Sequence, residues 1–388
     1  MAATVEGLVN TVPEYQICTN CVMDTSDSVI SFDETGMCDH CTSFYRDVKP
    51  NWHPNGRGRT ELSKIVEKIK LDGKNRDFDC IMGVSGGADS SYMLHLAVTE
   101  FGLRPLVFHV DGGWNSQIAV NNIEVLINGL DLDLYTEVID WPEMRDFQLA
   151  YFKAGIPNID VPQDHAFIAA LYNFADAHGI RYILNGFNFS TECVQRPLEF
   201  FYWGTDMAQI RDITSRFGTR RLENYPFSGI LRHKLYLRYV KRIQVVKPLN
   251  YLPYVKADAM KLLAGRYGWQ PYSQKHFESR FTRFYEGYWL PRKFGFDTRR
   301  VEFSSLILNE QMARVEALEL LKEPAISDED ARADFEYVAK KLGISNEELQ
   351  SYMDAPNKTH KDYKNREWMF NWGSRALKML GVERAIRR

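Results

Sequence analysis

A glycine-rich turn between an apolar run and a helical pattern constrains the fold of this chain more than any other segment. The run at 78–84 gives way to Ser-Gly-Gly-Ala-Asp-Ser at 85–90, and apolar residues then recur at helical spacing over 94–101. We therefore predict a buried strand, a tight turn and the start of a helix, which is how strands and helices follow one another in a parallel α/β sheet.

This turn has the properties of an anion-binding site. Gly86 and Gly87 have no Cβ, so the backbone can approach phosphate oxygens, while the following helix presents the positive end of its dipole. Ser85 and Ser90 add hydroxyl donors. The segment is neither a Walker A loop nor a G-x-G-x-x-G dinucleotide fingerprint. A glycine turn that binds nothing stays open as the alternative from these six residues alone.

Strand and helix patterns alternate around this turn. An amphipathic helix is expected at 61–71, and short apolar runs predict further strands at 106–111, 134–139, 182–184 and 243–246. The alternation predicts a parallel sheet covered by helices on both faces.

Two consequences follow for this sheet. Asp164 is the expected N-cap of a helix that ends at Gly179. Because ligands bind at the carboxyl ends of parallel strands, residues 85–90, 109–113 and 185–192 are expected around one pocket.

Four cysteines near the N-terminus have the spacing of a metal site. Cys18 and Cys21 form one Cys-x2-Cys pair, Cys38 and Cys41 form a second, and sixteen residues separate the pairs. Four thiolates close a tetrahedron around one Zn²⁺ and leave no position for water, so we predict a structural zinc site. Four reduced cysteines without metal are the alternative. His40, between the last two cysteines, is expected to face solvent rather than to replace a ligand.

Composition limits the class of protein and its partners. The 388 residues are 45% hydrophobic with a formal net charge of −3, which predicts a globular chain without the basic field of a nucleic-acid-binding protein. No apolar run is long enough to span a membrane, and the start of the chain lacks the basic and apolar regions of a signal peptide. We therefore expect a soluble, cytoplasmic protein that binds small ligands and has no disulfides.

A composition shift suggests the domain boundaries. Residues from about 47 to 59 are rich in Pro, Gly and basic side chains. We divide the chain into a zinc-ribbon segment at 1–50, a nucleotide-binding domain at 51–253 and a helical C-terminal domain at 254–388. Helices are expected in the last domain at 258–267, 304–321, 327–342 and 346–353. Its aromatic-rich segment at 276–288 fits a substrate cleft or a packed core equally well.

A basic segment flanks the predicted pocket. Residues 211–247 carry ten Lys or Arg and two acidic residues. Arg232 and Lys234 are the candidate contacts for a second, anionic ligand such as the diphosphate of a sugar nucleotide. A solvated basic face is the alternative.

The Ser-Gly-Gly-Ala-Asp-Ser segment resembles the PP-loop of the nucleotide α-hydrolases, whose SGGxDS motif binds the pyrophosphate part of ATP. The resemblance implies a Rossmann-like ATP-binding domain in which the phosphates contact Ser85, Gly86, Gly87, Asp89 and Ser90. It also implies further nucleotide contacts at the ends of the second and fourth strands, namely His109, Asp111, Gly186 and Asn188.

Glu192, in the second of these loops, is the candidate ligand of the Mg²⁺ that accompanies ATP. Each of these side chains also has a structural interpretation: His109 fits a core histidine, Asp111 a turn cap and Glu192 a surface residue.

Several motifs together resemble the N-acetyl sugar amidotransferase family of bacterial O-antigen and flagellar glycan synthesis. They are the cysteine pairs with their flanks at 18–25 and 33–41, the SGGADSS loop, and segments at 294–300, 304–307 and 313–318. Family members convert the acetamido group of a nucleotide-linked sugar into an acetamidino group. The resemblance implies that ATP adenylates the acetamido oxygen and that ammonia then displaces AMP, with Asp89 and Glu192 as catalytic residues.

The expected source of ammonia is a separate glutaminase subunit. A glutaminase needs a cysteine nucleophile activated by histidine. In this chain four cysteines are assigned to metal, Cys80 opens a buried strand, and Cys193 has no histidine near it in sequence. The family resemblance implies the same partner.

Two other functions stay open. A PP-loop enzyme that thiolates tRNA would need a cysteine to carry sulfur, and Cys193 lies near the predicted pocket. A zinc-ribbon interaction module with a decayed nucleotide domain would not be expected to keep an intact SGGADS.

Overall fold

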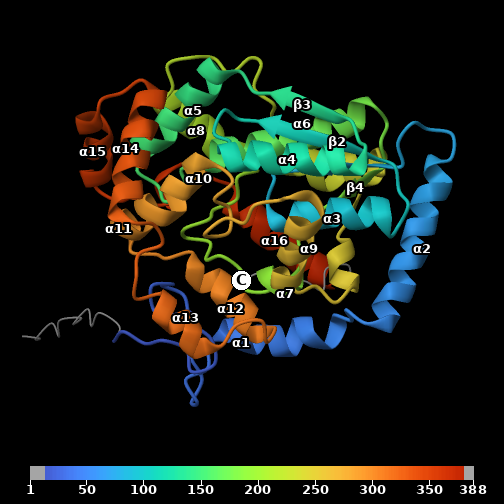
Figure 1. The fold of residues 1–388 in the computed structure, drawn as a ribbon. Coiled ribbons are helices and arrows are strands. Elements are labelled where there is room, and N and C mark those ends of the chain that lie inside the picture. Colours follow the sequence, from blue (N-terminus) through green and yellow to red (C-terminus); the bar gives the residue numbers. More distant parts are fainter. Residues whose placement is uncertain (1–13, 380–388) are drawn as a thin grey trace, which may run out of the picture.

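A five-stranded parallel sheet organises residues 14–379, the part of the chain that this computed structural model describes (Figure 1). The strand order is β3-β2-β1-β4-β5. The bounds are β1 (Cys80–Gly83), β2 (Pro105–Asp111), β3 (Leu134–Val138), β4 (Tyr182–Leu184) and β5 (Gln244–Val246). Every predicted strand is present with ends that differ by at most two residues, and the parallel α/β class is confirmed.

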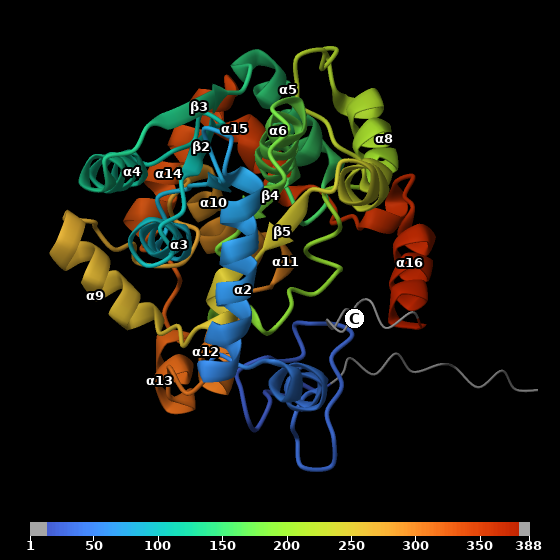
Figure 2. The same cartoon turned by 90° about the vertical axis from the view of Figure 1, so that its right-hand side faces the viewer.

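Helices cover both faces of the sheet, as predicted. They are α2 (Gly56–Gly73), α3 (Ala88–Thr99), α4 (Gln117–Leu130), α5 (Trp141–Ala154), α6 (Val161–Ala177) and α8 (Met207–Phe217), whereas the short α7 (Phe189–Glu192) packs against the C-terminal region. Met82 and Val107 join a core with α2, α3 and α4. Their strand neighbours Ile81 and Phe108 point the other way, into a core with α5, α6 and α8. Figure 2 shows α3 and α4 on one side of the sheet and α6 and α8 on the other.

The N-terminus of α6 differs from the prediction. Asp160, not Asp164, precedes the helix, and Pro162 occupies its first turn. Proline is favoured in a first turn because its fixed φ suits a helix and its missing N–H needs no partner there. Asp164 therefore lies inside the helix, and its side chain is exposed.

The C-terminal region is helical, which is also confirmed. Its helices are α9 (Lys256–Tyr267), α10 (Arg280–Phe284), α11 (Leu290–Phe294), α12 (Arg299–Leu308), α13 (Arg314–Leu320), α14 (Asp328–Leu342), α15 (Asn346–Asp354) and α16 (Glu367–Met379). The single helix predicted at 304–321 is wrong. Glu310 has φ of +59° between α12 and α13, and a left-handed residue ends a right-handed helix.

Packing joins parts that are distant in sequence. Helix α9 and Trp269 belong to the core formed with α3 and α4. The N-terminal segment, with α1 (Asp39–Ser43), instead shares its core with C-terminal helices, and Figure 1 shows it beside α12 and α13. Arg314 donates to the carbonyl oxygens of Cys18 (2.7 Å) and Cys21 (2.9 Å). The C-terminal helices thus hold the cysteine segment in place.

The remaining elements are 3₁₀ helices and π-helices. They are η1 (Phe44–Val48), η2 (Lys49–Asn51), η3 (Arg232–Val240), η4 (Pro248–Tyr251), η5 (Tyr285–Trp289) and η6 (His360–Asp362). Among residues 14–379, no helix has both the length and the apolar character of a membrane span. The first 13 residues, where a signal peptide was sought, lie outside the described part.

Candidate functional site

The glycine loop lies between β1 and α3, at the carboxyl edge of the sheet. The chain runs from β1 toward β2 and β3 on one side, and β4 and β5 lie on the other side. A crevice forms at such a point of reversal. Gly86 has φ of +83°, and a Cβ there would lie 2.7 Å from the Ala119 carbonyl oxygen. Gly186, after β4, packs on the same loop, where a Cβ would lie 3.1 Å from the Asp89 carbonyl oxygen.

Hydrogen bonds fix the path of the loop. The Gly86 carbonyl oxygen accepts from Trp269 Nε1 at 2.9 Å, from Tyr272 Oη at 3.2 Å and from Asn122 Nδ2 at 3.3 Å. Within the loop, Ser85 Oγ lies 3.3 Å from Ser90 Oγ and accepts from the Gly87 N–H at 3.3 Å. The loop backbone is therefore preorganised by donors from α4 and from the segment after α9.

Asp89 and Glu192, the two predicted catalytic residues, are joined by Lys275. Lys275 Nζ lies 3.2 Å from Asp89 Oδ2 and 2.7 Å from Glu192 Oε1. Asp89 also accepts from the Tyr254 hydroxyl. Burial by itself would raise the pKa of Asp89, but Lys275, the Tyr254 hydroxyl and Lys256 outweigh it and lower that pKa. Asp89 is thus held as a carboxylate.

Lys275 belongs to a segment that crosses the loop, residues 272–280, which we call the arm. The Ser116 N–H donates to the Glu278 carbonyl oxygen at 2.8 Å, and Asn115 forms a bridge with Ser279. A Cβ at Gly87 would overlap Glu278 Oε1, so the arm closes directly over the loop. No motif marks the arm in the sequence. The arm overlaps the start of the aromatic-rich segment at 276–288, which fits a substrate cleft or a packed core equally well.

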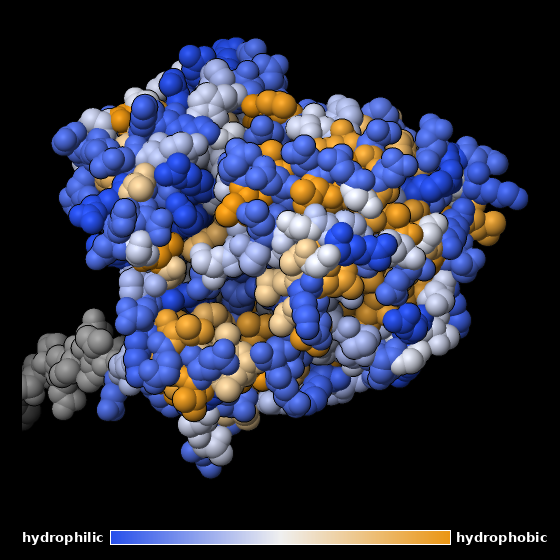
Figure 3. Space-filling view, in the orientation of Figure 1, coloured by the Kyte–Doolittle hydropathy of each residue, from blue (hydrophilic) through white to orange (hydrophobic). Residues whose placement is uncertain are grey.

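Three cavities adjoin at this site. One of about 590 Å³ lies at the ends of β1, β2 and β4 and has apolar walls that include Phe108, Ile168 and Leu171. One of about 1050 Å³ follows the loop to α9. One of about 1060 Å³ lies between the cysteine segment, residues 187–203 and α12. Glu192 and His276 line all three. Figure 3 shows a hollow with hydrophilic residues between the part carrying α10 and the part carrying α12 and α13.

The predicted nucleotide contacts differ in their surroundings. His109 lines the 590 Å³ cavity, yet its Nδ1 lies 2.9 Å from the Val84 carbonyl oxygen and its Nε2 lies 2.9 Å from Asn115 Nδ2. Asp111 accepts from the Gly113 N–H at 2.7 Å and lines none of the three cavities. Asn188 is fully buried and caps α7. Gly186 lines the cavity that follows the loop.

Of the two basic residues predicted to bind a second ligand, Arg232 faces a carboxylate instead. Arg232 Nη2 is paired with Asp176 Oδ2 at 2.8 Å, and Arg232 lines none of the three cavities. The Lys234 side chain lies outside the described part. Arg196, Lys256 and Lys275 are cations that do line the cavities. Sequence reasoning missed them because each is a single basic residue outside any motif.

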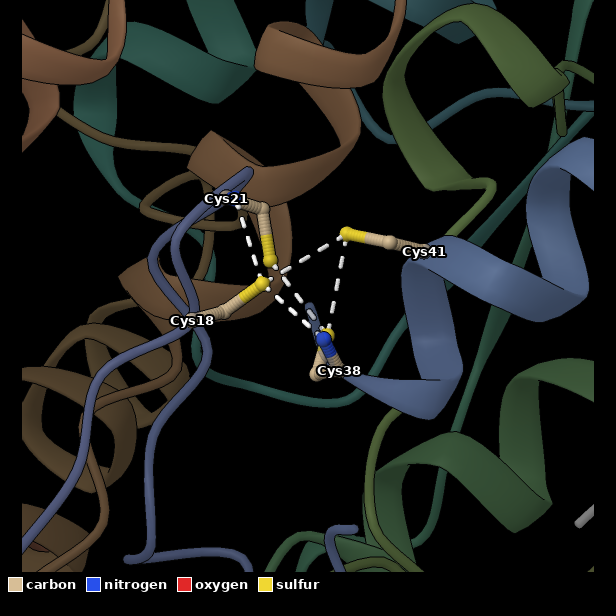
Figure 4. A group of neighbouring side chains, drawn as sticks. All are labelled: Cys18, Cys21, Cys38 and Cys41. Atoms are coloured by element: carbon tan, nitrogen blue, oxygen red, sulfur yellow. Dashed lines mark hydrogen bonds between the residues drawn. The ribbon is translucent and has the colours of Figure 1, made fainter. Parts of the chain in front are cut away.

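The four cysteines converge on one point, as Figure 4 shows. Their sulfurs are separated by 3.8 Å (Cys18 to Cys41), 3.6 Å (Cys21 to Cys38) and 3.6 Å (Cys38 to Cys41). Zn–S bonds of about 2.3 Å in a tetrahedron place sulfurs about 3.8 Å apart, so the residues fit Zn²⁺. All four are buried. The expectation for His40 is wrong: it is buried, with Nε2 2.9 Å from Asp27 Oδ2.

The two other cysteines are buried thiols. Burial raises the pKa of Cys193 to about 12, and Asn309 Nδ2 lies 3.4 Å from its sulfur. Burial also raises the pKa of Cys80. A protonated thiol is a poor nucleophile and a poor carrier of sulfur.

Comparison with known proteins adds a family match. Residues 278–376 match the family model described as LPS biosynthesis protein WbpG-like, C-terminal domain. No curated protein sequence matches the chain.

Three solved structures with some likeness to this chain are synthetases. NMN synthetase from Francisella tularensis has 14% identity and a TM-score of 0.31, over 77% of this chain and 97% of that chain. NH3-dependent NAD synthetase from Campylobacter jejuni has 15% identity and a TM-score of 0.27, over 54% of this chain and 93% of that chain. NAD+ synthetase from Burkholderia pseudomallei has 14% identity and a TM-score of 0.30, over 78% of this chain and 93% of that chain. Through residues 278–376, the chain is similar to the LPS biosynthesis proteins of the WbpG-like family.

Proposed function

We propose that this chain is an ATP-dependent, AMP-forming amidotransferase that converts the acetamido group of a nucleotide-linked sugar into an acetamidino group. The observation that carries the proposal is the SGGADS loop at the carboxyl edge of β1, covered by an arm that leads into the WbpG-like domain. The loop supplies the phosphate site, and the domain ties the chain to lipopolysaccharide synthesis.

ATP is proposed to bind with its phosphates at the loop and its adenosine in the 590 Å³ cavity. The apolar walls Phe108, Ile168 and Leu171 suit a base, and Ser85 lines both this cavity and the one along the loop. Lys256 and Lys275 line the loop cavity and offset phosphate charge. Mg²⁺ bound with ATP would add Lewis-acid stabilisation, and Glu192 is its candidate ligand once it leaves Lys275.

The acceptor sugar is proposed to occupy the 1060 Å³ cavity. Its lining includes Lys247, Lys361 and the aromatic residues Phe187, Phe201 and Trp203. Cations with aromatic faces suit the diphosphate and base of a nucleotide sugar. This cavity replaces Arg232 as the proposed acceptor site, because Arg232 faces Asp176 instead.

The reaction needs no nucleophilic side chain. The acetamido oxygen bonds to the α-phosphorus, and the bond from that phosphorus to the bridging oxygen breaks, so pyrophosphate leaves with the electron pair. Ammonia then bonds to the imidate carbon, the carbon–oxygen bond breaks with its electrons going to AMP, and one ammonia proton is lost. Asp89 keeps Lys275 in place beside the phosphates throughout.

We further propose that ammonia comes from a separate glutaminase subunit. Cys80 and Cys193 are both buried, so neither suits the nucleophile of a glutaminase. The chain should use ammonium but not glutamine, and the partner should restore glutamine use. Glutamine hydrolysis by the pure chain in step with AMP release would refute this part.

A substrate screen tests the whole proposal. The chain is incubated with ATP, Mg²⁺, ammonium and candidate nucleotide sugars. We expect AMP, pyrophosphate and a sugar product one mass unit lighter, because NH replaces O. If no nucleotide sugar yields AMP, the proposal is wrong.

A further inference from the structure

Two of the cavities meet at a small polar cluster. The 590 Å³ and 1060 Å³ cavities share Glu192, Arg196, Phe201, His276 and Glu286 among their lining residues. Under the proposed function the first holds adenosine and the second holds the acceptor. The acetamido oxygen would then meet the α-phosphorus near this junction, where the loop cavity also adjoins through Glu192 and His276.

Arg196 is the best-anchored cation at this junction. Its Nη2 lies 2.9 Å from Glu286 Oε1 and 2.7 Å from His276 Nδ1. Its guanidinium lies over the Phe201 ring, 4.4 Å from the centroid. These contacts use one edge and one face of the guanidinium, while the side chain remains 31% exposed to the cavities. Arg196 is thus fixed and still able to donate to a ligand.

The partners of Arg196 are themselves constrained. Glu286 is only 6% exposed, and burial would raise its pKa, but Arg196 and His276 lower it to about 2. His276 has φ of +66°, an uncommon conformation outside glycine that clusters at functional sites. His276 thus has a left-handed backbone conformation at the position where its Nδ1 lies beside Arg196.

We propose that Arg196 binds the α-phosphoryl group during transfer, and that Glu286 and His276 position it. This inference rests on the proposed function. As the acetamido oxygen bonds to phosphorus, negative charge builds on the equatorial phosphoryl oxygens and on the departing pyrophosphate. A preorganised guanidinium at the junction stabilises that charge without reorganisation in the transition state. Glu286 and His276 are positioning residues, because they act through Arg196.

The experiment separates adenylation from the amidine-forming step. Acceptor-dependent exchange of labelled pyrophosphate into ATP measures the first step, and the amidino product measures both. Arg196→Lys keeps the charge but loses the planar fork, and we expect exchange to fall about 100-fold. The Kd values for ATP and acceptor, measured by calorimetry, should stay within about threefold, because the interaction strengthens in the transition state.

The control is Arg104→Met. Arg104 Nη2 pairs with the buried Asp79 at 2.7 Å, as Arg196 does with Glu286, but Arg104 lines none of the three cavities. Its exchange rate should stay within about twofold of the wild type. Glu286→Gln should lower the exchange rate about tenfold with little change in either Kd, a split that a purely structural role would not give. The double variant Arg196→Met, Glu286→Gln removes both charges, and its melting temperature shows whether the fold survives.

The outcomes are distinguishable. Wild-type exchange rates in Arg196→Lys would overturn the inference and leave the proposed function intact. Loss of ATP binding in proportion to loss of exchange would also overturn it, because Arg196 would then serve ground-state binding. Absence of acceptor-dependent exchange in the wild type, with every nucleotide sugar tried, would overturn the proposed function and this inference with it.

Discussion

The loop at 85–90 and the arm at 272–280 meet at one site but are specified differently. Under the proposed function, the loop acts through its backbone geometry, so few residue types are tolerated and a short motif results. The arm would instead act through side chains that reach the loop, such as Lys275, which pairs with Asp89. Many sequences can deliver one lysine to one carboxylate, so the arm has no motif. Under the proposed function, a motif therefore marks the phosphate site but not the charged side chains that surround it.

The cysteine segment repeats this contrast. The Cys-x2-Cys pairs mark the candidate metal site, whereas Arg300 and Arg314 hold the segment against α12 and α13 by donating to backbone oxygens of residues 18–22. Each motif-bearing segment is thus kept in place by a C-terminal segment without one.

The largest effect is expected where loop and arm touch. Gly87→Val should lower adenylation by about 100-fold or more, because the branched side chain displaces Glu278 and blocks the approach of phosphate oxygens to the loop backbone. Pyrophosphate exchange measures the loss, and circular dichroism checks the fold. Wild-type turnover in a folded variant would refute the assignment of the loop.

A pair of milder variants sharpens this test. Gly87→Ala should be partly rescued by Glu278→Ala, since the overlap is with that side chain. Gly86→Ala should not be rescued, because φ of +83° disfavours any Cβ and the nearest atom is the Ala119 carbonyl oxygen. If Glu278→Ala rescued Gly86→Ala as well as Gly87→Ala, the contrast between a backbone constraint at Gly86 and a side-chain contact at Gly87 would be wrong.

Lys275→Met should affect both stability and activity. The lysine is 12% exposed and separates two carboxylates, so its loss leaves Asp89 and Glu192 without their shared cation, at a cost of about 3 kcal/mol of unfolding free energy. Urea titration at pH 7 measures this cost. Lys275→Arg is the matched control, because it keeps the charge.

The pH dependence of this variant has a definite sign. In the wild type the pKa of Asp89 is lowered, so its contribution to stability is present above the usual aspartate pKa and is lost as pH falls through the lowered value. Without Lys275 that pKa rises. The acid-side loss of stability should then begin at higher pH in Lys275→Met. An unchanged acid limb would mean that Lys275 does not control Asp89.

The sequence predicts the strands well and the site only in part, for physical reasons. Buried parallel strands are continuous apolar runs bounded by turns, so their positions are visible locally. The start of α6 was missed because Asp164 has the chemistry of a cap, although Pro162 marks the earlier start. Lys275 and Arg196 were missed because their partners, Asp89 and Glu286, are distant in sequence.

The same limit explains why the sequence singles out Arg232 as a ligand contact without showing its carboxylate partner. Local charge density drew attention to residues 211–247, but density does not show which cations already have a carboxylate partner. Asp176, at the end of α6, pairs with both Arg232 and Lys241. Such a pairing becomes visible only when the chain is folded.

The cysteine segment gives a smaller, structural effect. Arg314→Ala removes hydrogen bonds from a guanidinium to the Cys18 and Cys21 carbonyl oxygens and should cost about 2 kcal/mol of unfolding free energy. Metal analysis should still find about one zinc per chain, whereas Cys38→Ser should lower the zinc content. Val29 and Val48 of the cysteine segment line the 1060 Å³ cavity. Loss of zinc in Cys38→Ser should therefore weaken binding of the acceptor more than binding of ATP. An iron–sulfur absorbance would contradict the zinc assignment.

The smallest effect is expected at Cys193, and it decides between amidation and tRNA thiolation. Sulfur transfer would need this thiol as a thiolate, so Cys193→Ser would abolish activity. Amidation assigns it no chemical step. Serine is close in size, and its hydroxyl can donate to the Ser305 carbonyl oxygen, which the thiol already contacts at 3.9 Å. We therefore expect turnover within about twofold of the wild type and a stability loss of about 1 kcal/mol. Cys193 lines the proposed acceptor cavity, so Cys193→Ala is measured alongside. Loss of turnover in both variants, with normal ATP binding and an intact fold, would favour tRNA thiolation over amidation.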